Sequence, residues 1–263
     1  MRRVPRLVAV VLVTGAALGW GSSATSAPPK ADDILFQYSS LQTLQAGVYD
    51  GDLTAGELKR HGDFGLGTFN TLDGEMVVLD GSVYQVKADG VVYRPADSQK
   101  LPFAVVTDFA ADQTIEVDQA VDCAGLQKYL DSQLPSLNVP YAIKISGTFA
   151  QLKTRSVPSQ IRPYRPLAEV VKTQATFDFT NVSGDMVGFR LPGYMAGVNA
   201  AGYHLHFLTA DRKAGGHVLS CQVQNVNAEL DLTGEWSMLL PSDPDFYHVD
   251  LSSPTPASST KTE

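Results

Sequence analysis

Three Asp-Gly pairs, at residues 73–74, 80–81 and 89–90, recur at seven- to nine-residue intervals and separate short apolar runs. Asp-Gly strongly favours a tight turn between antiparallel strands, because both residues tolerate positive φ. A second group of strand-like runs lies between residues 175 and 240, and the best helix pattern covers residues 123–134. The pattern therefore predicts an α+β protein with mixed or antiparallel sheets and a few short helices.

The order of these runs indicates two β-rich parts. Residues 68–77 resemble residues 179–187, which is consistent with two related halves, although unrelated hairpins can also resemble each other. We expect an N-terminal α+β domain at residues 28–165 and a C-terminal β-rich domain at residues 166–251. The boundary falls in a proline-rich connection.

Both ends of the chain have special compositions. Residues 1–27 combine three early arginines, an apolar run and small polar residues, which predicts a signal peptide cleaved after Ala24 or Ala27. An uncleaved signal anchor is the alternative. The Ser/Thr/Pro-rich tail, residues 252–263, is expected from its composition to be disordered. The mature protein is therefore expected to be secreted or periplasmic, and free of the membrane once the signal is removed.

The charge limits the possible partners. The chain has 20 basic and 28 acidic residues, and removal of the three signal arginines leaves 17 against 28, a net charge of −11. This charge argues against nucleic acid or an anionic membrane surface as a partner. Export permits a disulfide between Cys123 and Cys221, but their spacing does not show whether one forms.

Three of the five histidines lie within fourteen residues. His204 and His206 are two apart, so in a strand both project from the same face. A hairpin folded about Asp211 and Arg212 would bring His217 opposite His206. Three neutral imidazoles that leave one coordination position open form a ligand set of catalytic zinc. The alternative is a polar hairpin whose histidines pack or face solvent.

An acid and a cation could complete such a site. Glu75 follows a tight turn, and Arg155 lies just beyond a predicted strand, beside the proline-rich connection. A planar guanidinium can bind a carboxylate through two hydrogen bonds. From the residues alone, a solvated turn acid and a surface arginine are the more common fates of such residues.

Seven segments between residues 34 and 251 together resemble α-acetolactate decarboxylase of the bacterial secreted type. They are Ile-Leu-Phe-Gln-Tyr-Ser (34–39), Gly-Asp-Leu-Thr (51–54), Gly-Leu-Gly-Thr-Phe-Asn-Thr-Leu-Asp-Gly-Glu-Met (65–76), Gly-Thr-Phe-Ala-Gln-Leu-Lys-Thr-Arg-Ser-Val-Pro (147–158), Arg-Pro-Tyr (162–164), Gly-Tyr-His-Leu-His-Phe (202–207) and Gly-Gly-His-Val-Leu (215–219). The combination is far more specific than His-x-His alone.

The resemblance implies a role for each candidate residue. It implies that His204, His206 and His217 bind zinc, and that Glu75 and Arg155 act on the substrate. It also implies a threonine near the substrate, which matches Thr68. A further glutamate from the tail is matched to Glu263 by counting on from residues 250–251. The resemblance thus implies an alternative to disorder, in which the tail, residues 252–263, covers the active site.

The activity implied by the resemblance is conversion of (S)-2-acetolactate to (R)-acetoin and carbon dioxide by a homodimer. Zinc would be the electron sink, without an organic cofactor. Two other classes remain open at this point: a cupin-like metalloenzyme, and a secreted metal- or carbohydrate-binding module without catalysis. Such a module would not need Glu75 and Arg155 near the histidines, so their distance discriminates between the classes.

Overall fold

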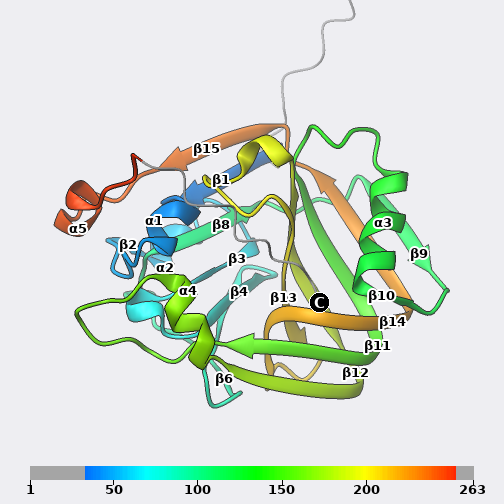
Figure 1. Cartoon of the computed structure of the whole chain (residues 1–263). Coiled ribbons are helices and arrows are strands. Elements are labelled where there is room, and N and C mark those ends of the chain that lie inside the picture. Colours follow the sequence, from blue (N-terminus) through cyan, green and yellow to red (C-terminus); the bar gives the residue numbers. More distant parts are fainter. Residues whose placement is uncertain (1–32, 253–263) are drawn as a thin grey trace, which may run out of the picture.

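The computed structural model describes residues 33–252 of the chain. The predicted signal peptide and Glu263 lie outside this range. The strands form two large sheets and one small two-stranded sheet (Figure 1). The expectation of an α+β protein with antiparallel or mixed sheets and a few short helices is confirmed.

The first sheet has seven strands in the order β15-β1-β8-β3-β4-β5-β6. Their bounds are β1 Ile34–Tyr38, β3 Phe64–Thr68, β4 Glu75–Leu79, β5 Ser82–Val86, β6 Val92–Tyr93, β8 Phe103–Thr107 and β15 Glu235–Leu239. The predicted meander is β4, β5 and β6. Its Asp80-Gly81 turn has positive φ at both residues, as a tight hairpin turn requires.

The second sheet has six strands in the order β10-β14-β11-β12-β13, with β9 paired to β14. Their bounds are β9 Gln113–Val117, β10 Val121–Asp122, β11 Tyr141–Ser156, β12 Ala175–Leu191, β13 Gly202–Thr209 and β14 Gly215–Leu232. The small sheet pairs β2 (Leu53–Thr54) with β7 (Lys100–Leu101). The two large sheets pack together through buried side chains such as Val77 from β4 and Phe189 from β12.

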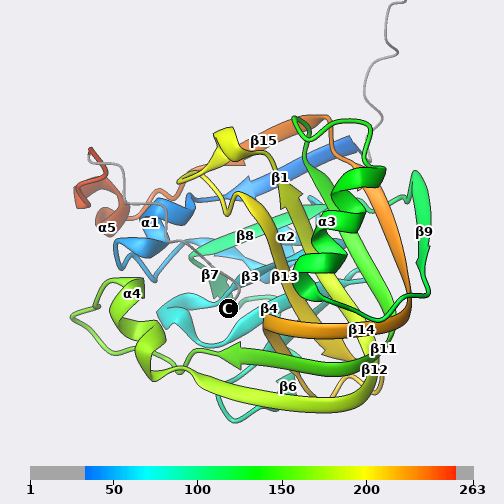
Figure 2. The same ribbon diagram turned by 45° about the vertical axis from the view of Figure 1, so that its right-hand side comes forward.

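The helices are short and lie around the sheets. They are α1 Leu41–Gln45, α2 Ala55–Leu58, α3 Cys123–Gln133, α4 Leu167–Val170 and α5 Pro244–His248, with 3₁₀ turns η2 Asn70–Leu72, η3 Val171–Thr173 and η4 Gly193–Met195. Each helix of the described range is too short or too polar to cross a membrane. Figure 2 shows α3 lying against the second sheet, where Leu126 and Leu130 are buried.

The sequence left open whether the two cysteines are bonded, and helix α3 brings them together. Cys123, its first residue, forms a disulfide with Cys221 of β14, and their Cα atoms are 5.0 Å apart. The disulfide therefore joins the start of the helix to a central strand of the second sheet.

The sheets do not divide the chain at the expected boundary, 165/166. β11 and β12 lie on opposite sides of it, yet they pair from Tyr141↔Arg190 to Ser156↔Ala175. β15, from the C-terminal part, pairs in parallel with β1 in the first sheet. The two parts expected from the sequence therefore share both large sheets, because local apolar patterns show where strands run but not which distant strands pair.

The resembling segments 68–77 and 179–187 also differ in structure. The first contains the η2 turn between β3 and β4, whereas the second lies inside the continuous strand β12.

Candidate metal centre and active site

The three histidines lie on the hairpin formed by β13 and β14. His206 and His217 are Cα partners across the two strands, as predicted, and the turn between them includes Arg212 with a φ of 58°. The ring centroids are 5.1 Å apart for His204 and His206, 5.0 Å for His204 and His217, and 5.2 Å for His206 and His217. One ligand nitrogen from each residue lies within 4.8 Å of the others. The rings therefore converge on one point.

Burial keeps these imidazoles neutral. It lowers the pKa of His206 to about 3, and it lowers the pKa values of His204 and His217 well below their ordinary value, with Arg155 adding to the effect in all three. A neutral imidazole has a free lone pair, which is the form that binds a metal.

The hydrogen bonds of the rings also fit a metal site. His206 Nδ1 lies 2.7 Å from the carbonyl oxygen of Met76 on β4. Because a carbonyl only accepts, Nδ1 carries the proton and Nε2 holds the lone pair. This Nε2, together with Nδ1 of His204 and Nδ1 of His217, is buried without a hydrogen-bond partner. Buried polar atoms are rarely left unpaired, so three such atoms in one cluster fit a bound cation.

Glu75 is the first residue of β4 and extends toward the hairpin. Its Oε2 lies 3.5 Å from Nε2 of His206, and its Oε1 lies 3.7 Å from Nη1 of Arg155. Burial raises the pKa of Glu75, and Arg155 opposes part of this rise. Its position at the end of a turn agrees with the sequence, but the interpretation as a solvated turn acid is wrong because the side chain is buried.

Arg155 lies within β11, not beyond the strand as expected. β11 continues to Ser156 because β12 pairs with it up to that residue, and β14 pairs with it up to Arg155, the Cα partner of His217. Its side chain is 16% exposed, so it is not a surface arginine. The guanidinium therefore comes to the histidines from the strand next to their hairpin.

Thr68 of β3 is the Cα partner of Glu75. Its buried hydroxyl donates to the carbonyl of Gly74 at 2.7 Å, so Thr68 stabilises the turn that presents Glu75. Its role near the substrate stays a prediction. Glu263 lies outside the described residues, and its role also stays a prediction.

One residue of the site was missed from the sequence. Gly216 precedes His217 and has a φ of 128°, and a Cβ on it would lie 2.5 Å from the carbonyl oxygen of Arg155. The hairpin backbone can approach β11 this closely only without a side chain. The adjacent glycines 215 and 216, directly before a histidine, are the sequence signal for this contact.

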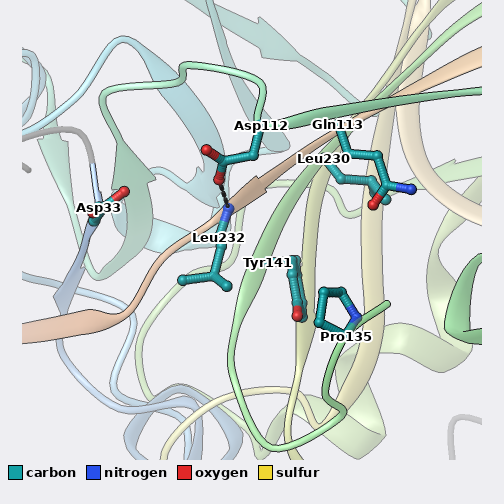
Figure 3. A pocket seen from close by; sticks show the side chains of 7 residues that line it. All are labelled: Asp33, Asp112, Gln113, Pro135, Tyr141, Leu230 and Leu232. Carbon is teal, nitrogen blue, oxygen red and sulfur yellow. Dashed lines mark hydrogen bonds between the residues drawn. The ribbon is translucent and has the colours of Figure 1, made fainter. Parts of the chain in front are cut away.

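The pocket drawn in Figure 3 lies elsewhere. It has a volume of about 380 Å³ and is lined by Tyr141, Leu230 and Asp112 among others, with Asp112 accepting a hydrogen bond from the backbone N–H of Leu232. None of the histidine, glutamate or arginine residues described above lines it. The candidate site is therefore defined by converging side chains, not by this pocket.

The distances separate the classes left open by the sequence. A binding module without catalysis would not require Glu75 and Arg155 beside the histidines. In the structure, Glu75 contacts both His206 and Arg155 at less than 4 Å. The described site thus combines three histidines able to hold a metal ion, a buried acid and a cation on an α+β scaffold, an arrangement typical of a metal-dependent enzyme.

Comparison with known proteins specifies this class. The sequence pattern of the family described as alpha-acetolactate decarboxylase matches residues 35–253. The chain is 49% identical over 221 residues to the alpha-acetolactate decarboxylase of Methanosarcina mazei, covering 84% of this chain and 77% of that protein. It is 43% identical over 232 residues to that of Brevibacillus brevis, covering 88% and 81%.

A solved structure agrees with the sequence relatives. The crystal structure of alpha-acetolactate decarboxylase from Bacillus subtilis strain 168 superimposes with a TM-score of 0.83 at 39% identity, covering 84% of this chain and 94% of that one. The chain therefore belongs to the alpha-acetolactate decarboxylase family, a family of carboxy-lyases. This membership replaces the cupin-like alternative.

Proposed function

We propose that the protein converts (S)-2-acetolactate to (R)-acetoin and carbon dioxide, with Zn²⁺ held by His204, His206 and His217. The observation that carries the proposal is the cluster of three unpaired imidazole nitrogens beside the contact between Glu75 and Arg155, in a member of this family. Three neutral imidazoles and one open position are the ligand set that zinc uses in catalytic sites.

The chemistry explains why a metal is needed. Loss of carbon dioxide leaves an electron pair on the neighbouring carbon, and the bound zinc would supply the Lewis acid that accepts this charge. Arg155 has donors that can bind the substrate carboxylate or the negative charge that develops on oxygen. Arg155 and the histidines occupy neighbouring strands, so Arg155 can bind one end of the substrate while the zinc held by the histidines would bind the other.

Glu75 is our first candidate for the proton that replaces carbon dioxide. Burial raises its pKa, so its protonated form is more populated near neutral pH than that of an exposed glutamate. Its Oε2 lies 3.5 Å from Nε2 of His206, which supports this role because the acid is next to the proposed ligand set. Glu263 remains the second acid/base candidate, and Thr68 the candidate for a polar contact to the substrate.

The metal proposal is tested by His206→Ala, with His248→Ala as the matched control. His248 is an exposed histidine of α5, away from the ligand set. We expect His206→Ala to lose bound zinc and acetoin formation, and His248→Ala to keep both. Full activity of His206→Ala without bound metal would overturn the proposal.

We also propose that the protein acts outside the cytoplasm as a homodimer. The signal-like residues 1–27 and the disulfide between Cys123 and Cys221 support export, because disulfides persist in oxidising compartments. The family resemblance supports the dimer. N-terminal sequencing of protein recovered from the periplasm or medium tests the first part, and light scattering of the mature protein tests the second.

A further inference from the structure

Arg155 is flanked in β11 by two fully buried hydroxyl residues, Thr154 and Ser156, each 0% exposed. Each hydroxyl donates to a backbone carbonyl of a different element: Thr154 Oγ1 to Gly215 at 2.7 Å, and Ser156 Oγ to Val86 at 2.8 Å. A buried carbonyl that loses its donor is costly, so these two hydrogen bonds constrain the elements that they join.

The bond from Thr154 holds the histidine hairpin. Pairing between β11 and β14 is irregular here, because Lys153 is opposite Ser220 whereas Thr154 is opposite Val218. The skipped residue makes a bulge directly before the pairing of Arg155 with His217. At this point the Thr154 hydroxyl bonds to Gly215, and Gly216 lies against the Arg155 carbonyl. Thr154 therefore fixes the hairpin against β11 next to a metal ligand.

The hydrogen bond from Ser156 connects β11 to the first sheet, which carries Glu75. Val86 of β5 is the Cα partner of Glu75, so Ser156 is bonded to the strand beside the buried acid. One residue further on, the carbonyl of Val157 accepts from the N–H of Gly74, directly before Glu75, at 3.1 Å. The two residues after Arg155 are thus hydrogen-bonded to Val86, which is opposite Glu75, and to Gly74, which precedes Glu75.

The side chains of the site do not fix this geometry by themselves. Arg155 and Glu75 are 3.7 Å apart, and Glu75 and His206 are 3.5 Å apart, which are longer than strong charge-assisted hydrogen bonds. The relative placement of the three groups must then come from the backbone that carries them. A displacement of about 1 Å can reduce a catalytic rate about a hundredfold.

We propose that Thr154 and Ser156 are positioning residues: Thr154 fixes Arg155 against the metal-binding hairpin, and Ser156 fixes Arg155 against Glu75. The assignment rests on the proposed function. It separates two effects, because Thr154 acts on the histidine side of the site and Ser156 acts on the acid side.

The test compares Thr154→Val, Ser156→Ala and wild type. Valine keeps the shape of threonine and removes the donor. For Thr154→Val we expect zinc affinity, measured by competition with a chelator, to fall about tenfold, as when a supporting hydrogen bond around a metal ligand is lost. For Ser156→Ala we expect unchanged zinc affinity and a kcat about tenfold lower, with KM less affected, because the acid moves relative to Arg155.

Two further variants serve as controls. Thr154→Ser keeps the hydroxyl and should restore zinc affinity. Thr148→Val changes a threonine of the same strand whose exposed hydroxyl contacts Ser183 at 2.9 Å, and it should leave zinc affinity and kcat unchanged. Circular dichroism establishes that each variant is folded. If Thr154→Val does not fold, Thr154→Ser decides the Thr154 part, and loss of zinc affinity in this variant overturns it.

The outcomes are distinguishable. Wild-type zinc affinity in Thr154→Val, unchanged kcat in Ser156→Ala, or equal losses in Thr148→Val would each overturn the positioning roles. A wild-type protein that forms no acetoin would overturn the proposed function instead, and chelator competition would still report whether Thr154 supports the hairpin.

Discussion

The carboxylate of Glu75 lies between a guanidinium and an imidazole, and its side chain is 9% exposed. Its environment shifts its pKa in two opposite directions. Burial favours the protonated acid, and Arg155 favours the carboxylate. This balance suits a group that must hold a proton and then release it.

The role of Glu75 predicts the behaviour of Glu75→Gln. The amide keeps the size of the side chain and cannot deliver a proton, so kcat should fall about 10²- to 10⁴-fold while bound zinc is retained. Steady-state kinetics and metal analysis measure both quantities. Glu116→Gln, an exposed glutamate of β9, is the matched control. Near-normal kcat in Glu75→Gln would contradict the assignment.

Sequence alone predicts the arrangement of the histidines better than it predicts the positions of the acid and the cation. Alternation in a strand and a turn about Asp211 were enough to predict that His206 faces His217. The residues alone made Glu75 and Arg155 only candidates, and their roles came from the family resemblance. Glu75 reaches the histidines only when the two sheets pack together, and Arg155 reaches them only when β11 pairs with β14. Thr154 and Ser156 carry no sequence pattern, since a buried hydroxyl in a strand is defined by its distant acceptor.

The sequence predicted that β11 is a strand better than it predicted where β11 ends. The apolar alternation of β11 ends near Leu152, and the next four residues are polar, so the strand was expected to stop there. The ladder continues to Ser156 because β12 pairs with the strand up to Ser156 and β14 pairs with it up to Arg155.

The close contact between β14 and β11 predicts the effect of Gly216→Ala. The added methyl group meets the Arg155 carbonyl, and the φ of 128° is unfavourable for alanine. We expect a loss of about 1–3 kcal/mol in unfolding free energy and weaker zinc binding. Gly193→Ala is the control, since its Cβ would meet no atom within 4 Å. Chemical denaturation and chelator competition measure the two effects; equal behaviour of the two variants would disprove the strain.

A pH-dependent contact joins β1 to the segment after β15. Burial alone would raise the pKa of Asp52, but hydrogen bonds to its carboxylate from Ser242 and Tyr38 lower it below its ordinary value. A lowered folded-state pKa gives stability that is present above the unfolded-state pKa, near 4, and is lost as the pH falls through the folded-state value.

Asp52→Asn should therefore reduce the unfolding free energy at neutral pH by about 1 kcal/mol, because part of the carboxylate remains solvated. The difference from wild type should shrink as the pH falls below about 4. Urea denaturation across this pH range measures it. Asp118→Asn, an exposed aspartate, is the control. A difference that grows toward acid pH would contradict the assigned sign.

At the scale of the whole molecule, the site depends on the packing of two sheets whose strands come from both ends of the chain. Sequence patterns predicted the strands and the fold class, but not that β15 joins the first sheet or that β9 and β10 join the second. Those pairings depend on contacts between segments far apart in the chain, which periodicity cannot report.

The disulfide closes a long loop of the chain. Cys123 and Cys221 are 98 residues apart in sequence, so the bond strongly restricts the unfolded chain. Replacing both cysteines with alanine should lower the unfolding free energy by about 2–5 kcal/mol. Wild type in a reducing agent should lose a similar amount, and the double variant should not respond to reductant. An unchanged urea midpoint in the double variant would show that the bond adds no stability.

The parallel pairing of β1 with β15 has a consequence for biosynthesis. Ile34 lies opposite Glu235, so one of the first strands to leave the ribosome must wait for a partner about two hundred residues later. Until then one edge of β1 has no neighbour, and the sheet that carries Glu75 is unfinished. The pairing of β1 with β15 can thus form only after most of the chain has been made, and ribosome-bound chains that stop before residue 235 should lack a complete first sheet.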